Sequence, residues 1–193
     1  MAIPGVMLLD AIWQENQLTQ EWVQQVEQPA LQSRAAPPRA VASTTKSPTS
    51  KPQAQRPSSS PVRAPQIAFA IRVPRLNYFA AVRQGISLDV LFAGPGHYPA
   101  TAMPGEQGNV GIAAHNTYWI AFGVLKPGDI VILETRNGSY TYKIYGSQIV
   151  SPNNTTVLAP TQDHRLTLTT CWPLWAGALA TQRLVFLAEE VNT

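Results

Sequence analysis

The pattern of hydrophobic positions divides the chain into three parts. Between residues 8 and 27, apolar side chains recur at spacings typical of an amphipathic helix; they are Leu8, Ile12, Trp13, Leu18, Trp22, Val23 and Val26. Between residues 29 and 65, large apolar residues are almost absent. From residue 66 onward, short β-branched runs alternate with Gly, Pro, Asn and Asp, which predicts strands separated by turns.

The third part contains eight candidate strands and little helical periodicity. The candidates are residues 68–73, 77–82, 110–114, 130–135, 140–149, 157–158, 165–170 and 184–189. The run from Arg136 to Ser139 is a hairpin signal, because its Asn137-Gly138 pair can adopt the positive φ angles of a type I′ turn. Many short strands with little helix predict an all-β domain, either a closed barrel or a sandwich.

The middle part, residues 29–65, has eight prolines, six basic residues and no acidic residue. Such a composition cannot bury enough apolar surface to offset its ordering entropy, so a disordered, extended linker is expected. Residues 1–28 hold four acidic and no basic residues, whereas 66–193 hold eight basic and seven acidic ones. The positive charge therefore belongs to the linker. It favours a basic tether near an anionic envelope over a nucleic-acid-binding face.

The start of the chain leaves two interpretations open. The mostly apolar run from Met1 to Leu9 is far shorter than the roughly 18–20 residues of a spanning helix. It also lacks the basic region and the cleavage site of a signal peptide. Either the chain is neither anchored nor exported, or Met1 to Leu9 is the tail of a lost transmembrane helix. The second alternative places the folded part at the extracytoplasmic face of the cell membrane.

Cys171 is the only cysteine, and it ends a strand-like run that begins at Arg165. One thiol cannot form an internal disulfide or a cysteine-based zinc cage, so a functional Cys171 is expected to be reactive. No metal or cofactor is predicted. Of the three histidines, His115 is favoured over His97 and His164 as its partner, because it also ends an apolar run.

Arg183 opens the next apolar strand, and its guanidinium beside Cys171 could stabilise a thiolate or an oxyanion. Strand alternation puts Thr167, Thr169 and Cys171 on one face, and Leu166, Leu168 and Thr170 on the other. Plainer alternatives exist for each residue. A lone cysteine is more often a small buried apolar residue. A histidine at a strand end is commonly a polar group whose hydrogen bonds are already made, and an arginine is usually a surface charge.

Two separated motifs resemble the sortase family of cysteine transpeptidases. Thr167-Leu168-Thr169-Thr170-Cys171 is similar to the family's TLxTC signature, and Arg183 follows at the expected distance. The run from Gly94 to His115 resembles the family's GHYP, T-x-x-PGE-x-GN and A-x-H segments. The resemblance covers about residues 67–191. Trp172-Pro173 looks most like class D, E or F sortases.

The resemblance implies a closed eight-stranded sortase-type β-barrel over residues 66–193. It implies Cys171 as the nucleophile, His115 as the general acid and base, and Arg183 as the residue that stabilises the oxyanion. His97 matches a motif position outside this trio. Thr169, Thr170, Trp172 and Trp175 are expected to bind substrate, although the tryptophans could instead plug the barrel end.

The implied activity is cleavage of an LPxTG-like or LAxTG-like sorting signal after Thr, through a thioester. The acyl group then passes to an amine of a peptidoglycan precursor or a pilin. A monomer is expected. The alternatives are a sortase-fold thiol hydrolase and a non-catalytic envelope barrel that binds extended peptides. One position departs from the family: Asn116 stands where an arginine usually follows the catalytic histidine, which could change how the next loop is held.

Overall fold

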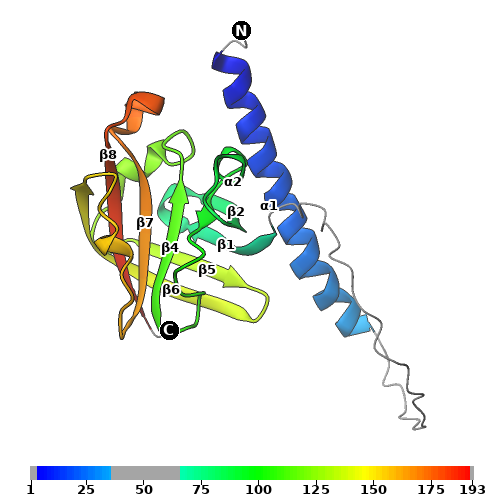
Figure 1. Cartoon of the computed structure of the whole chain (residues 1–193). Helices are drawn as coiled ribbons and strands as arrows, with labels where there is room; N and C mark the ends of the chain where they lie inside the picture. Colours follow the sequence, from blue (N-terminus) through cyan, green and yellow to red (C-terminus); the bar gives the residue numbers. More distant parts are fainter. Residues whose placement is uncertain (1–3, 36–65, 192–193) are drawn as a thin grey trace, which may run out of the picture.

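A closed eight-stranded barrel forms the body of the protein (Figure 1). The computed structural model describes residues 4–35 and 66–191. Around the barrel the strands follow the order β1-β2-β3-β4-β7-β8-β6-β5. They are β1 Ile67–Val73, β2 Tyr78–Gln84, β3 Gly96–His97, β4 Gly108–Ala114, β5 Ile130–Thr135, β6 Gly138–Val150, β7 His164–Trp172 and β8 Gln182–Glu190. The predicted closed barrel is therefore confirmed, and the sandwich is excluded.

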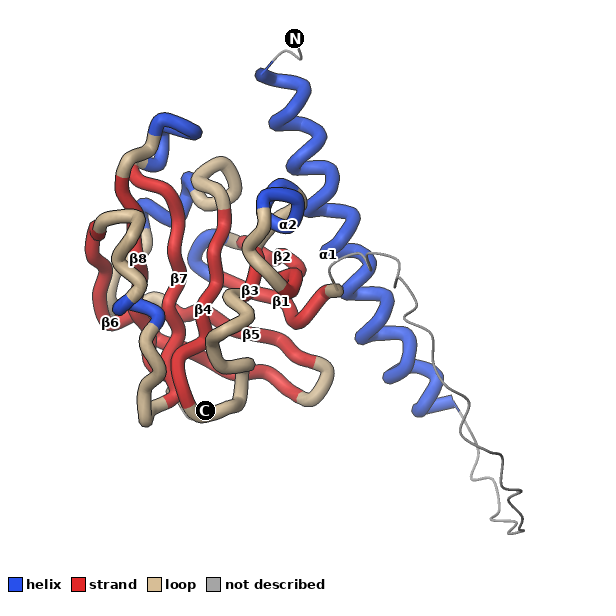
Figure 2. The backbone as a smooth tube through the Cα atoms, viewed as in Figure 1, coloured by secondary structure: helices blue, strands red, loops and turns tan. Residues whose placement is uncertain are grey.

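Short helical segments connect the strands, and one long helix lies outside the barrel (Figure 2). The helices are α1 Pro4–Ala35, α2 Leu88–Phe92 and the 3₁₀ segments η1 Pro74–Leu76, η2 Ile120–Val124, η3 Thr156–Leu158 and η4 Leu174–Leu179. Helix α1 begins before and ends after the predicted residues 8–27, and it continues through Pro29 into the predicted linker. Residues 36–65 of that linker lie outside the described part of the chain. Among the described helices, none has an apolar stretch sufficient to cross a bilayer.

Strand β7 lies between β4 and β8, and this arrangement determines where the site forms. Strands β4 and β7 are parallel, in an unbroken ladder from the Gly108–His164 pair to the Ala114–Thr170 pair. Strands β7 and β8 are antiparallel, and their ladder runs to the same end of β7. Residues that follow β4, end β7 and begin β8 therefore meet at one end of the barrel.

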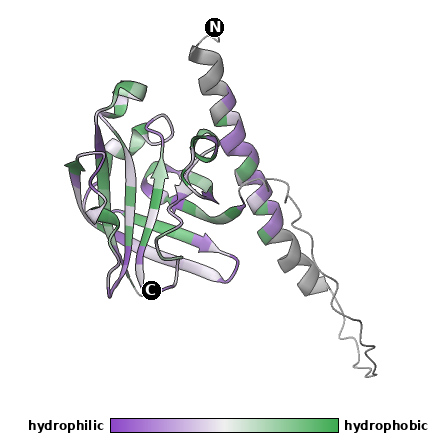
Figure 3. Cartoon of the chain, in the orientation of Figure 1, coloured by the Kyte–Doolittle hydropathy of each residue, from purple (hydrophilic) through white to green (hydrophobic). Residues whose placement is uncertain are grey.

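Alternating apolar residues from the strands fill the barrel interior. Figure 3 shows hydrophobic residues recurring along the strands and mostly hydrophilic ones along the middle of α1. Interior side chains that are fully buried include Phe69, Ile71, Val110, Ile112, Val131, Leu133, Leu166 and Leu168. Leu166 and Leu168, which were predicted to share one face of their strand, thus both point into the barrel. Helix α1 adds Trp22 to this core, where the side chain is only 1% exposed.

The predicted strand at 157–158 is wrong, because these residues belong to the 3₁₀ segment η3. The Asn154 side chain accepts hydrogen bonds from both the backbone N and the hydroxyl of Thr156, which starts this turn. The carbonyl of Val157 accepts bonds from the Asn109 amide and the Thr167 hydroxyl. Side chains therefore provide the partners that a neighbouring strand would have supplied.

The predicted hairpin joins β5 and β6, but its turn differs in detail. The ladder ends at the Thr135–Gly138 pair, and Gly138 has a φ of 154°. Asn137 does not have the positive φ expected for a type I′ turn, since Asn77 is the only non-glycine residue with positive φ among those described. Instead, the Thr135 hydroxyl accepts a bond from the Asn137 backbone N and donates one to the Gly138 carbonyl.

Candidate active site

Cys171 lies near the end of β7, opposite Arg183 of β8. The two residues are direct partners in the antiparallel ladder, and such side chains leave the same face of a sheet with their Cβ atoms about 5 Å apart. On the other side of β7, the parallel ladder ends at the pair formed by Ala114 and Thr170. His115 follows Ala114 directly, so it continues the row that contains Cys171 and Arg183. Three adjacent strands thus bring the predicted trio together.

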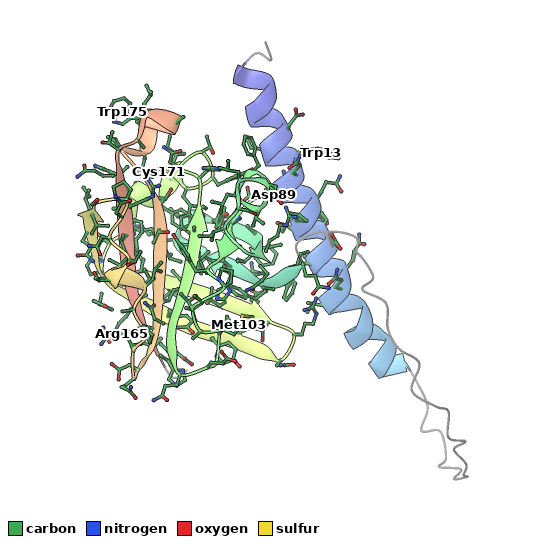
Figure 4. The ribbon with its side chains drawn as sticks, in the orientation of Figure 1. Trp13, Asp89, Met103, Arg165, Cys171 and Trp175 are labelled. Atoms are coloured by element: carbon green, nitrogen blue, oxygen red, sulfur yellow. The ribbon has the colours of Figure 1, made fainter. Side chains whose placement is uncertain are left out.

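The row faces outward from the barrel wall. Because Leu166 and Leu168 point into the core, alternation directs Thr169 and Cys171 to the opposite face. Cys171 is half-buried and is a free thiol. Figure 4 places Cys171 toward the barrel end that carries Trp175, whereas Arg165 lies at the opposite end. A peptide lying on the outer surface can therefore reach the thiol.

His115 is half-buried beside an aromatic ring and a positive charge. Its imidazole meets the ring of Phe92, at the end of α2, edge to face, with 5.9 Å between ring centroids. Burial lowers the pKa of His115, and the charge of Arg183 lowers it further. Both effects disfavour the imidazolium, so the neutral imidazole is the dominant form at neutral pH. A neutral imidazole can accept a proton from a thiol or an incoming amine.

Arg183 is half-buried at the start of β8. One guanidinium nitrogen, Nη1, donates a hydrogen bond to the carbonyl of its neighbour Gln182 at 3.2 Å. The positive charge of the guanidinium also acts on His115, whose pKa it lowers. A planar, permanently charged group at this position is suited to a carbonyl oxygen that becomes negative during acyl transfer.

Asn116 holds together the loops that follow the histidine and the cysteine. The side chain is 3% exposed, and its Nδ2 group donates to the carbonyl oxygens of Pro173 and Gly177 at 3.5 and 3.4 Å. Pro173 and Gly177 lie in the connection between β7 and β8. From the sequence, Asn116 was notable only because the family usually has an arginine at this position. Its bonds could not be predicted, because they join segments that are distant in sequence.

The other two histidines lie apart from this row. His164 starts β7, seven residues before Cys171, which corresponds to roughly 23 Å along a strand, and its Nδ1 lies 3.2 Å from Glu190. His97 is buried in β3, with its ring nitrogens bonded to Gln84 and to the carbonyl of Ala102. Burial lowers the pKa of His97. Both histidines therefore have structural partners of their own.

The four residues expected to bind substrate occupy different environments. Thr169 shares the face of Cys171, but its hydroxyl is hydrogen-bonded to Tyr98 at 3.0 Å. Thr170 points inward and is 2% exposed. Trp172 lines a cavity of about 360 Å³ together with Ile149, Leu184 and Phe186. Trp175 stands at the tip of the β7–β8 connection and is 82% exposed. Of the four, only Trp175 is exposed; Trp172 is half-buried, and both threonines are buried.

The fold is that of the closed β-barrel cysteine transpeptidases. A family model described as the sortase domain matches residues 71–191, which is more than half of the chain. The protein therefore belongs to the sortase family, whose members are transpeptidases of surface proteins. The match begins in β1, so helix α1 lies outside it.

Individual relatives agree with this assignment. Sortase D of Bacillus subtilis is 29% identical over 153 residues, covering 78% of this chain and 76% of the relative. Sortase SrtE1 of Streptomyces coelicolor is 35% identical over 130 residues, which are 56% of this chain and 37% of the relative. The structure also resembles that of the Clostridium perfringens Sortase D5 transpeptidase, with a TM-score of 0.60 and 27% identity, over 65% of this chain and 79% of that one. These relatives are named as sortases D and E, two of the three classes, D, E and F, that the sequence resembles.

Proposed function

We propose that this sortase cleaves an LPxTG-like or LAxTG-like sorting signal after its threonine and transfers the new acyl group to an amine. Cys171 is the nucleophile, His115 the general acid and base, and Arg183 the group that stabilises the oxyanion. The observation that carries the proposal is the row formed by the three residues, with Cys171 directly opposite Arg183 and His115 just beyond the β4–β7 ladder.

In the first half-reaction, the Cys171 thiol gives its proton to the neutral His115 imidazole, and the resulting thiolate attacks the threonine carbonyl carbon. The carbonyl electrons move to oxygen, and the Arg183 guanidinium lies beside the resulting negative charge. Collapse of the tetrahedral intermediate breaks the C–N bond to glycine. Protonated His115 gives its proton to the departing amine, which leaves a neutral imidazole and an acyl thioester on Cys171.

In the second half-reaction, an amine attacks the thioester carbon. Neutral His115 accepts a proton from this amine, and the Cys171 thiolate leaves. The product is a new amide bond, and the starting pair of thiolate and imidazolium is restored. The acceptor we propose is an amine of a peptidoglycan precursor or a pilin. Water in its place gives hydrolysis, which is the competing activity.

We further propose that the enzyme acts as a monomer at the extracytoplasmic face of the cell membrane, where such acceptors are available. Substrate recognition is assigned to Trp172 and Trp175, since Thr169 and Thr170, the other two predicted residues, are buried. Trp175 provides the sharpest test because of its exposure. Trp175→Ala should raise KM for the peptide with little change in kcat. An unchanged KM would show that Trp175 does not bind the peptide. Trp13→Ala, a change at another exposed tryptophan, is the matched control.

The decisive experiment is intact-mass detection of an acyl adduct after incubation with LPxTG and LAxTG peptides. The expected result is an adduct on wild-type protein that is absent from Cys171→Ala and disappears when a peptide amine is added. Cleavage by Cys171→Ala would overturn the proposal. Failure to form any adduct across a broad peptide library would instead favour a non-catalytic barrel that binds extended peptides. Release of free acid despite added amine would identify a hydrolase.

A further inference from the structure

Helix α1 is packed into the barrel rather than merely tethered to it. It lies along the barrel beside β1 and β2 (Figure 1). The Trp22 side chain enters the core, and Arg136 of the β5–β6 turn lies over its ring at 5.3 Å. The Thr19 hydroxyl accepts a hydrogen bond from the backbone N of Ala81 in β2. These contacts give α1 a fixed position relative to the strands.

One acidic side chain of α1 faces the barrel instead of solvent. Glu15 accepts a hydrogen bond from the Tyr78 hydroxyl of β2, with 2.6 Å between Oη and Oε1. The same hydroxyl accepts a bond from the indole nitrogen of Trp119 at 3.3 Å. Tyr78 is thus the central member of a hydrogen-bond network that connects α1, β2 and the segment after β4. Burial raises the pKa of Glu15 to about 7, and the Tyr78 hydrogen bond partly offsets this.

This hydrogen-bond network ends at the backbone of His115. The backbone nitrogens of Tyr118 and Trp119 both donate to the His115 carbonyl, at 3.1 and 3.3 Å. The Tyr118 hydroxyl also donates to the carbonyl of Phe92, the residue whose ring contacts the His115 imidazole. Trp119 is completely buried, so its position fixes the turn that carries His115. Displacing its indole would move that turn.

We infer that Glu15 is a positioning residue, which holds His115 in place for proton transfer through Tyr78 and Trp119. The inference rests on the proposed role of His115. A buried carboxyl group that contributed only to helix packing would be replaceable by an apolar residue without kinetic effect, since desolvation makes such a group costly. A positioning role requires instead an acceptor for the Tyr78 hydroxyl, because that hydroxyl orients the Trp119 indole.

The test compares substitutions at Glu15 and Tyr78 in the full chain. Glu15→Leu removes the acceptor, and Tyr78→Phe removes the central hydroxyl while keeping the ring. Each should lower kcat about 10-fold, a partial loss of the roughly 100- to 10,000-fold that general acid–base catalysis contributes, with KM changed less than twofold. Glu15→Gln retains an acceptor oxygen and should keep near-wild-type kcat. The matched control is Glu21→Gln, at an exposed position of the same helix.

A double-mutant cycle tests whether the two residues act as one unit. The combined Glu15→Leu/Tyr78→Phe variant should lose no more kcat than either single variant, because the two substitutions break the same hydrogen-bond network. Unchanged kcat in folded Glu15→Leu and Tyr78→Phe proteins would overturn the inference. Equal loss in Glu15→Gln would overturn it as well, since the acceptor would then be irrelevant.

An NMR titration of the histidine rings separates this inference from the proposed function, because it needs no turnover. In Glu15→Leu and Tyr78→Phe, the His115 ring signals should shift and its pKa should rise toward the ordinary value as the contact with Phe92 loosens. His97 and His164, which have partners elsewhere, serve as internal controls. An unshifted His115 in both variants contradicts the inference. An inactive wild-type protein contradicts only the proposed function.

Discussion

Cys171 and Arg183 are direct partners across the antiparallel ladder of β7 and β8. The register therefore holds the guanidinium on the same face as the thiol, independently of the long connection between the two strands. The position of the charge relative to the thiol is a property of the barrel wall, whereas the loops control what approaches it. Four predictions follow from this arrangement and from the contacts around it.

Arg183→Lys should lower kcat by about 100-fold, because an ammonium keeps the charge but loses the planar fork that reaches a developing oxyanion. Peptide cleavage kinetics measure the effect, and thermal unfolding should show a folded protein. The matched control is Arg72→Lys, which changes an arginine paired with Glu134 on the far side of the barrel. A kcat within threefold of wild type would exclude Arg183 from transition-state stabilisation.

Arg183→Gln should raise the pKa of His115. The positive charge of Arg183 disfavours the imidazolium, so removing it makes protonation easier. The rise should be incomplete, because burial is the larger cause of the lowered pKa and remains. NMR titration of the His115 ring provides the measurement, with His164 at the other end of β7 as the control. A pKa that stays constant or falls would show that the two groups do not interact.

Asn116→Ala should destabilise the protein by about 1 kcal/mol, since two carbonyls lose a buried donor. For a protein of this size that corresponds to a fall in Tm of roughly 2–4 °C. Asn153→Ala, at an exposed turn position, should leave Tm unchanged. Faster alkylation of Cys171 in Asn116→Ala would accompany the loosened loop. Equal Tm values for the two variants would show that the bonds to Pro173 and Gly177 contribute nothing.

The stability of helix docking should depend on pH through Glu15. Its carboxyl group is hydrogen-bonded to Tyr78 of β2 and interacts electrostatically with Tyr118 of the loop after β4. Its pKa is about 7 in the folded protein against 4.5 for an ordinary glutamate. The folded state therefore binds the proton more tightly than the unfolded state does. Stability falls as pH rises from about 4.5 to 7 and is constant above that range, as far as this group is concerned.

Glu15→Gln should abolish this loss. Each pKa unit corresponds to about 1.4 kcal/mol, so a rise from 4.5 to about 7 means that the ionised carboxyl costs on the order of 3 kcal/mol at pH 8. The variant should unfold at a higher temperature than wild type at pH 8, by roughly 6–12 °C, and at nearly the same temperature at pH 4. Thermal unfolding at both pH values measures the difference. A constant difference between the two proteins at all pH values would refute the raised pKa.

Local sequence was sufficient to predict the strand ends that carry Cys171, His115 and Arg183. An apolar alternating run with a polar reactive residue at one end is a local signal. Cys171 and His115 follow their runs, and Arg183 precedes its run. The pairing of β4 with β7 is different, because alternation does not specify which strand lies beside which. The hydrophobic pattern favoured His115 as the partner of Cys171, because both residues end an apolar run, and the resemblance to sortases led to the same pair.

Contacts between distant segments account for what the sequence did not reveal. The bonds of Asn116 and the contact of Phe92 with His115 depend on loops whose course has no periodic signal. Glu15 is an instructive omission, because a signal was present. It precedes Leu18 and Trp22 at helical spacing, so it lies on the apolar face of α1, where an ionisable group needs a partner. Examining that face for charges would have identified it.

The parallel β4–β7 ladder has a consequence for how activity arises during folding. Parallel strands form no hairpin, so the pairing of β4 with β7 closes a long segment of the chain that includes β5 and β6. Cys171 and Arg183, by contrast, are close in sequence and pair across adjacent antiparallel strands. A chain that lacks the β4–β7 pairing therefore has the thiol and the guanidinium but not the imidazole beside them. Closure of the barrel is what brings the acid–base group to the nucleophile.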